Sequence, residues 1–136
     1  MIYLASPYSH PDPAVREQRF NEACRAAAAF TKFGQHVFSP IAHSHPIAKH
    51  GAPTDWKFWE AYDRKFIEWC NLFGVLRLDG WQISVGVQAE IQIARELKKP
   101  VWYLDLHPAE TFGLSGYLED ATQQTSFHGF NRIAGN

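Results

Sequence analysis

The sequence has no basic run, no long apolar segment and only two cysteines, and each absence excludes a class of function. The formal net charge is -1 and Lys and Arg are scattered, so the charge pattern of a protein that binds DNA or RNA is missing. No apolar stretch approaches the length of a membrane span, and no charged region precedes the first apolar residues. We therefore expect a cytoplasmic protein that binds neither polymeric nucleic acid nor a membrane, whereas a single mononucleotide is compatible with this charge.

Several cofactor classes are also disfavoured. Cys24 and Cys70 have apolar neighbours in predicted helices, where a thiol usually packs as a small hydrophobic group rather than acting as a nucleophile. No Gly-x-Gly-x-x-Gly follows the first apolar run, so no redox dinucleotide is expected. The spacing of His43, His45 and His50 could suit a metal, but no Cys, Asp or Glu lies beside them, and contact with a substrate or a polar-loop role is favoured.

Short apolar runs alternate with segments of helical length. Asp12-Pro13, Thr54 or Asp55, and Ser84 are signals for helix starts. With 136 residues, of which 46% are hydrophobic, the chain is expected to form one domain. The alternation predicts an α/β fold over residues 1–106, a Rossmann-like or flavodoxin-like parallel sheet of four to five strands with helices on both faces. Strands are predicted at 2–5, 36–40, 72–78 and 101–106, and helices at 13–33, 55–70 and 84–97.

Three further expectations concern less regular segments. Residues 41–53 are predicted to be a long loop that carries the histidines. The helix at 55–70 is expected to pack through an apolar stripe made by Trp59, Tyr62, Phe66 and Trp69. The tail at 107–136 could contain one short helix, and its aromatic residues must pack on their own domain or on a partner.

Two acidic residues stand out because of their positions on predicted helices. Glu90 shares a helix face with Gly86, Ile93 and Leu97, so the stripe that should pack on a sheet carries a carboxylate. Either Glu90 reaches water or a basic partner at the edge of the stripe, or it is a cleft carboxylate at the carboxyl end of a strand. Asp63 is either a surface residue paired with the basic side chain of Arg64 or Lys65, or a second residue of the site.

Three motifs together resemble the nucleoside 2-deoxyribosyltransferase family. They are the starting Ile2-Tyr-Leu-Ala-Ser-Pro, Asp63 followed by Cys70-Asn71, and Ser84-Val-Gly-Val-Gln-Ala-Glu90 followed by Ala94. The resemblance covers roughly residues 1–106. It is closest to the relatives of that family that hydrolyse the N-glycosidic bond of nucleoside 5'-monophosphates.

The resemblance implies roles for both acids. Glu90 would attack the anomeric carbon and form a covalent glycosyl-enzyme, as in retaining glycosidases, and Asp63 would protonate or orient the base. The nearby helix N-terminus is expected to help keep Glu90 ionised, and the two environments should separate the pKa values of the two acids. Neither a cofactor nor a metal is needed for this mechanism.

The resemblance also implies how the substrate is bound. Ser84 matches a serine that binds phosphate in the hydrolases, and Gly86 leaves the backbone of a helix start accessible. Ser115, with Phe127 twelve residues later, is similar to a segment that reaches the site of a neighbouring subunit, which implies a homodimer or higher homo-oligomer. The first loop departs from the hydrolases' glycine- and arginine-rich pattern, so the remaining substrate-binding candidates match no motif securely. These candidates are Tyr3, Ser6, Tyr8, Ser9 and His45, with Arg16 or Arg19 as a source of charge.

The sequence therefore predicts an N-glycosidase that releases a free base from a nucleoside or deoxynucleoside 5'-monophosphate. A deoxyribosyltransferase that passes the sugar to another base needs the same nucleophile and is the first alternative. A nucleotide-binding module without catalysis is the second, because a fold alone does not imply activity.

Overall fold

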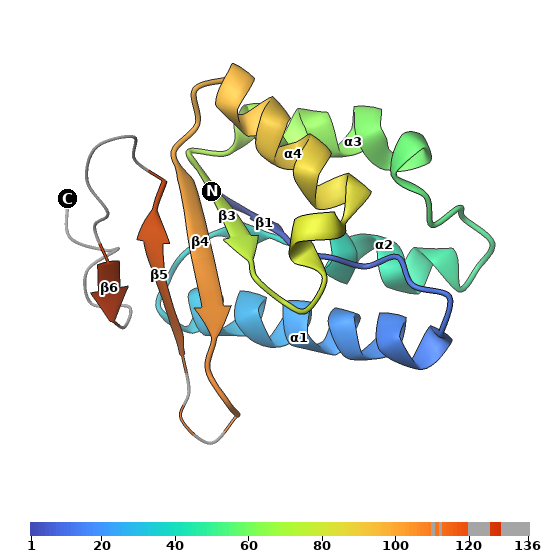
Figure 1. Cartoon of the computed structure of the whole chain (residues 1–136), viewed down its shortest axis with the longest axis horizontal. Helices are drawn as coiled ribbons and strands as arrows, with labels where there is room; N and C mark the ends of the chain where they lie inside the picture. Colours follow the sequence, from blue (N-terminus) through green and yellow to red (C-terminus); the bar gives the residue numbers. More distant parts are fainter. Residues whose placement is uncertain (110, 112, 120–125, 129–136) are drawn as a thin grey trace.

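The chain folds around one six-stranded sheet, as seen in a computed structural model that describes residues 1–109, 111, 113–119 and 126–128. The strand order is β2-β1-β3-β4-β5-β6 (Figure 1). The first four strands of that order are parallel, and β5 and β6 are antiparallel to their neighbours. The strands are β1 (Ile2–Ala5), β2 (Val37–Phe38), β3 (Leu72–Leu76), β4 (Val101–Leu106), β5 (Leu114–Leu118) and β6 (Ser126–His128).

Helices cover both faces of the sheet, so the predicted α/β class is confirmed. The helices are α1 (Pro13–Lys32), α2 (Pro40–Ala48), α3 (Trp56–Trp69) and α4 (Val85–Glu96), and a short 3-10 turn, η1, spans Trp81–Ile83. In Figure 1, α1 lies on one side of the sheet while α3 and α4 lie on the other. None of the helices in the described part of the chain is long and apolar enough to cross a membrane.

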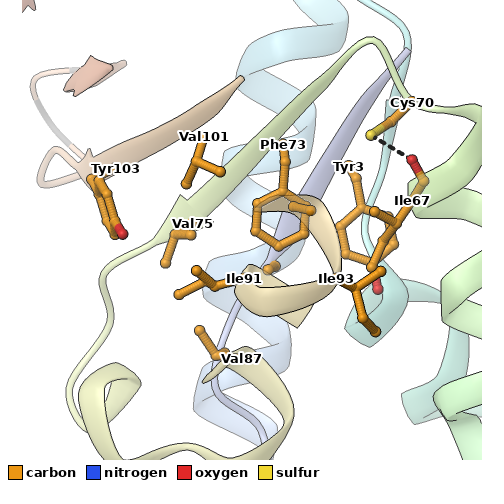
Figure 2. Close-up of a cluster of buried hydrophobic side chains, with 12 residues drawn as sticks. Tyr3, Ile67, Cys70, Phe73, Val75, Val87, Ile91, Ile93, Val101 and Tyr103 are labelled. Atoms are coloured by element: carbon orange, nitrogen blue, oxygen red, sulfur yellow. Dashed lines mark hydrogen bonds between the residues drawn. The ribbon is translucent and has the colours of Figure 1, made fainter. Parts of the chain in front are cut away.

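The alternation of side chains along β1 divides the core in two. Ile2 and Leu4 pack toward α1, in a cluster with Phe30 and Leu104. Tyr3 and Ala5 point the opposite way, into a cluster with residues of α3 and α4. Figure 2 shows Tyr3 and Phe73 of this second cluster, whose rings stack with their centroids 5.3 Å apart.

The predicted helix starts are also confirmed. Asp12 accepts a hydrogen bond from the Ala14 amide, and Pro13 occupies the first turn of α1. Asp55 caps α3 and Ser84 caps α4 through the amides of Phe58 and Val87. These side chains satisfy amides that have no acceptor within their own helix.

Two predicted segments were wrong. Residues 40–48 form α2 rather than a loop, because Ser39 caps the helix through the Ala42 amide and Pro40 suits its first turn. The expected short helix after residue 106 is replaced by β5, which pairs with β4 from Leu114↔Leu106 to Leu118↔Trp102. The sheet thus has six strands rather than the four to five parallel ones that were predicted, and the two strands beyond β4 are antiparallel.

The expected apolar stripe of α3 was wrong as well. The residues of this helix that are buried are Asp63 and Ile67, whereas Trp69 is 74% exposed and Tyr62 39% exposed. Of the expected stripe, Phe66 is half-buried and packs against the core, with its ring stacked on Phe38 at a centroid distance of 3.8 Å. Tyr62 and Trp69 contact Phe66 from either side. The face of α3 that meets the rest of the fold therefore carries a carboxylate.

Candidate functional site

A cavity of about 530 Å³ lies beyond the carboxyl ends of β1 and β3. The chain leaves β1 toward β2 on one side, whereas β3 is followed by β4 on the other side. Open α/β sheets bind ligands where the strand order reverses in this way. The lining is drawn from the loop after β1, α2, the start of α3 and the start of α4: Ser6, Tyr8, Ser9, Ile41, Ser44, Thr54, Asp55, Trp56, Lys57, Trp59, Asp63, Ile83, Ser84, Val85, Gly86, Val87 and Glu90.

Glu90 and Asp63 both line this cavity and are both buried, with 6% and 5% of their surface exposed. Glu90 stands in the second turn of α4, and Asp63 faces it from the middle of α3. One carboxylate oxygen of Glu90 is buried and makes no hydrogen bond to any residue that the structure describes. The alternatives in which these acids lie at the surface are therefore wrong, because both side chains are buried and Asp63 makes no ion pair with Arg64 or Lys65. Burial of an unpaired carboxylate is costly, so the position of these acids needs a functional explanation.

The electrostatics of the pair differ from the expectation. Burial, followed by the negative charge of Asp63, raises the pKa of Glu90 well above its usual range, and the Tyr3 hydroxyl opposes this shift. Burial alone raises the pKa of Asp63 to about 7. Burial and the charge of Asp63 thus oppose the ionised form of Glu90. The expectation that the helix N-terminus helps to keep Glu90 ionised stays a prediction, and the effect of a helix dipole falls off beyond the first turn.

Polar groups without partners collect beside Glu90. The hydroxyls of Tyr3 and Ser6 are buried and make no hydrogen bond within the described chain. The Tyr3 hydroxyl is nevertheless near enough to Glu90 to favour its ionised form. Tyr3 is buried and is not part of the cavity wall, so it acts on Glu90, while Ser6 belongs to the wall although its hydroxyl oxygen is buried.

Tyr8 lines the cavity, and His45 lies behind it. The Tyr8 hydroxyl is 2.6 Å from Nδ1 of His45, and Nε2 of His45 is 2.7 Å from Oε2 of Glu17. His45 is buried and is not part of the cavity wall. His45, which was expected to contact the substrate, therefore contacts Tyr8 instead, and Tyr8 is placed to contact a ligand in the cavity.

Arg19 connects the two loops that border the cavity. Its guanidinium donates to the carbonyl oxygens of Tyr8 and Ser9 in the loop after β1, at 3.3 and 2.9 Å. It also donates to the carbonyl oxygen of Asp79 after β3, at 2.9 Å. Gly80 adopts φ +88°, a backbone conformation that other residues rarely adopt, and a Cβ there would lie 2.9 Å from Arg19 Nη2, so a substitution would be strained and would displace the guanidinium.

Neither Arg16 nor Arg19, the expected sources of charge, is part of the cavity wall. Arg16 donates to the carbonyl oxygens of His10 and Pro11, and its guanidinium also lies near the hydroxyl of Tyr8, which lines the cavity. The basic residue in the cavity wall is instead Lys57, in the first turn of α3. Sequence reasoning missed Lys57, although its place just after the Asp55 cap was a usable signal.

Two helix N-termini open onto the cavity, those of α3 and α4. Ser84 caps α4 by accepting a hydrogen bond from the Val87 amide, and its hydroxyl also faces the cavity. The amides of Val85 and Gly86 have no acceptor inside α4. A Cβ on Gly86 would meet Trp56 at 3.7 Å, an ordinary contact, so the fold does not itself require this glycine. Together with Lys57, these amides make one part of the cavity suited to an anion.

Apolar and aromatic side chains complete the wall. Trp56 and Trp59 come from α3, and the Trp59 indole donates to the carbonyl oxygen of Pro53 at 2.7 Å. Ile83 and Val85 are 86% and 73% exposed at the rim. Flat apolar surfaces of this kind suit an aromatic ligand, and the sequence reading had assigned the tryptophans no place in a site.

Ser115 lies away from the cavity. It belongs to β5, opposite Asp105 of β4, and its hydroxyl lies 3.0 Å from Nε2 of His107. The expectation that it serves the site of a second subunit stays a prediction, as does the oligomer. The side chain of Phe127 lies outside the described residues.

The histidines of α2 point to different partners. His43 contacts Tyr62, whereas His45 contacts Tyr8 and Glu17. Within the residues that the structure describes, no group of three His, Cys, Asp or Glu side chains could hold a metal ion.

Residues 1–105 match the protein family described as "Domain of unknown function (DUF1937)", and the chain belongs to this family. The match covers β1 to β4 and every element that lines the cavity. A comparison with curated proteins found no match.

Proposed function

We propose that the protein is an N-glycosidase that cleaves the bond between base and sugar of a nucleoside 5'-monophosphate. The observation that carries this proposal is the burial of Glu90 and Asp63 in one cavity, with a Glu90 oxygen that has no partner. A pair of carboxyl groups flanking one bond is the usual apparatus of glycoside cleavage.

In this mechanism Glu90 attacks the anomeric carbon as the bond to the base breaks, and water then hydrolyses the glycosyl-enzyme, which releases the sugar phosphate and restores the Glu90 carboxylate. Departure of the base leaves an oxocarbenium-like sugar, and a carboxylate that is shielded from water stabilises this positive charge more strongly than one in solvent. The reactive form of Glu90 is ionised. The Tyr3 hydroxyl favours that form, and the positive charge that develops on the sugar lowers the Glu90 pKa further as the reaction proceeds.

Asp63 is the proton donor to the departing base. Its pKa of about 7 means that it can hold a proton at neutral pH and still release it. A proton that stays on Asp63 also removes the negative charge that disfavours an ionised Glu90. Catalysis requires opposite protonation states, an ionised Glu90 and a protonated Asp63, whereas burial favours the protonated form of both acids.

The rest of the cavity fits a nucleoside monophosphate. Lys57, Ser84 and the free amides of α4 can receive the phosphate, and the tryptophans can stack on the base. A deoxyribosyltransferase would use the same nucleophile and is distinguished only by an acceptor base.

The test is release of free base, measured by HPLC, from ribo- and deoxyribonucleosides and their 5'-monophosphates, with and without an added acceptor base. Release from monophosphates is expected, with a loss of at least about 10³-fold in Glu90→Gln. Glu96→Gln, an exposed residue of the same helix, should retain the rate. If no substrate yields free base, or if Glu90→Gln is as active as the wild type, the proposal fails.

A further inference from the structure

A chain of hydrogen bonds leads from the cavity to the surface of α1. The Tyr8 hydroxyl contacts Nδ1 of His45 at 2.6 Å, and Nε2 of His45 contacts Glu17 at 2.7 Å. The His45 side chain is 7% exposed, whereas that of Glu17 is 47% exposed. Phe20 stacks on the imidazole with 4.3 Å between the ring centroids, which holds the ring in one orientation.

The protonation of Glu17 sets the direction of these bonds. The hydrogen bond from His45 and the nearby Lys49 ammonium, 3.5 Å away, lower the pKa of Glu17. An ionised carboxylate only accepts hydrogen bonds, so Nε2 of His45 must carry a hydrogen. In the neutral imidazole Nδ1 is then an acceptor, and the Tyr8 hydroxyl donates its single hydrogen to it.

Tyr8 consequently offers the cavity only oxygen lone pairs. A ligand group in contact with this oxygen must be a donor. The Arg16 guanidinium also lies near this hydroxyl and is itself a donor. A phosphate dianion has no hydrogen to donate to the Tyr8 oxygen, whereas the hydroxyls of a sugar are donors. Ser6, in the same loop, provides a second hydroxyl that has no partner within the described chain.

We propose that Tyr8 determines specificity by accepting a hydrogen bond from a sugar hydroxyl of the nucleotide, and that His45 and Glu17 are positioning residues that keep it an acceptor. This inference rests on the proposed function for the identity of the ligand. Glu90 and Asp63 act at the bond between base and sugar and would not distinguish one sugar from another. Tyr8 would give the active site this selectivity between sugars.

The test uses a nucleoside 5'-monophosphate and its 2'-deoxy and 3'-deoxy analogues. Binding is measured by calorimetry in Glu90→Gln, so that turnover cannot consume the ligand. One deoxy analogue should bind about three- to tenfold more weakly than the parent nucleotide. With Tyr8→Phe added, which keeps the ring but removes the acceptor, that analogue and the parent should bind equally.

The positioning residues are tested in the same assay. Glu17→Gln can donate to Nε2, which allows the opposite tautomer of His45, so the preference between sugars should shrink. Glu22→Gln on the same helix is the matched control and should keep the preference. In the ligand-free protein, nitrogen NMR of the imidazole should show the His45 hydrogen on Nε2.

Several results would overturn the assignment of Tyr8. They are equal binding of all three nucleotides or none, a preference that survives Tyr8→Phe, and a His45 imidazole that carries a hydrogen on Nδ1, whether or not Nε2 also carries one. Failure of the proposed function gives a different pattern. The wild type would then release no base, while a preference between sugars that depends on Tyr8 would persist.

Discussion

The negative charge of Asp63 raises the pKa of Glu90 across the cavity that both residues line. Burial has the larger effect on Glu90, and burial alone raises the pKa of Asp63 to about 7. Both acids therefore hold protons in the folded chain at pH values where the unfolded chain has lost them. The unfolding free energy must depend on pH through this pair.

Asp63→Asn should be more stable than the wild type at high pH. Between about pH 4 and about pH 7 the folded state retains a proton on Asp63 that the unfolded state has released, so wild-type stability falls as the pH rises through this window. Asparagine carries no such penalty. The advantage of the variant should grow to roughly 2–4 kcal/mol at pH 8, measured by urea unfolding at a series of pH values.

Asp79→Asn is the control for this experiment, because Asp79 is exposed. Its stability difference from the wild type should stay constant with pH. If the difference between Asp63→Asn and the wild type is also constant from about pH 4 to about pH 8, the raised pKa of Asp63 is wrong.

Arg19→Lys should loosen the cavity. A lysine keeps the charge but cannot place its donors on the carbonyls of Tyr8, Ser9 and Asp79 at once, because only the guanidinium forms a planar fork. We expect a loss of about 1–2 kcal/mol in unfolding free energy. Amide hydrogen exchange should become faster in residues 6–12 and 79–84.

Arg25→Lys provides the comparison, since Arg25 makes one hydrogen bond, to the His107 carbonyl, at a distance from these loops. Exchange in the two loops should be unaffected by it. Equal exchange in Arg19→Lys and the wild type would mean that the arginine does not hold the loops together.

Local signals in the sequence were enough to predict much of the fold. The caps at Asp12, Asp55 and Ser84 and the apolar run at 101–106 correspond to elements that the structure confirms. The residues after β1 and before Glu90 were also expected to form the site, and Ser6, Tyr8 and Ser84 do line one cavity. Such signals depend on residues that are neighbours in the sequence, so they can be recognised in a single sequence without a structure.

Features that depend on packing were not predictable. The histidines and Pro46 of residues 40–48 masked the start signal of Ser39 and Pro40, so α2 was taken for a loop. On α3, spacing favoured the aromatic residues as the buried face, but Tyr62 and Trp69 are exposed and Asp63 is buried. The contact between Arg19 and Asp79 joins residues 60 positions apart, and no periodicity reports such a contact.

Gly86→Ala should separate stability from ligand binding. A Cβ at this position meets Trp56 at 3.7 Å, which is an ordinary contact distance. Because alanine favours a helix more than glycine does, Tm should be equal or higher, and the unfolding free energy should rise by up to about 1 kcal/mol. The added methyl occupies the cavity beside the free amides of α4. Base release from monophosphates should fall about tenfold or more in kcat/KM. A variant that is both stable and fully active would show that no ligand approaches this backbone.

Lys57→Met should impair recognition of phosphate in particular. Lys57 is the basic residue in the cavity wall, beside the starts of α3 and α4, and methionine keeps most of its apolar length. Because the side chain is exposed, the expected loss is modest, about three- to tenfold in kcat/KM for a monophosphate. The corresponding nucleoside should be processed at an unchanged rate, and added salt should reduce the difference between wild type and variant. Lys65→Met, on the same helix with a side chain 76% exposed, is the matched control. Equal losses for nucleoside and monophosphate in Lys57→Met would assign this lysine to the shape of the cavity rather than to the phosphate.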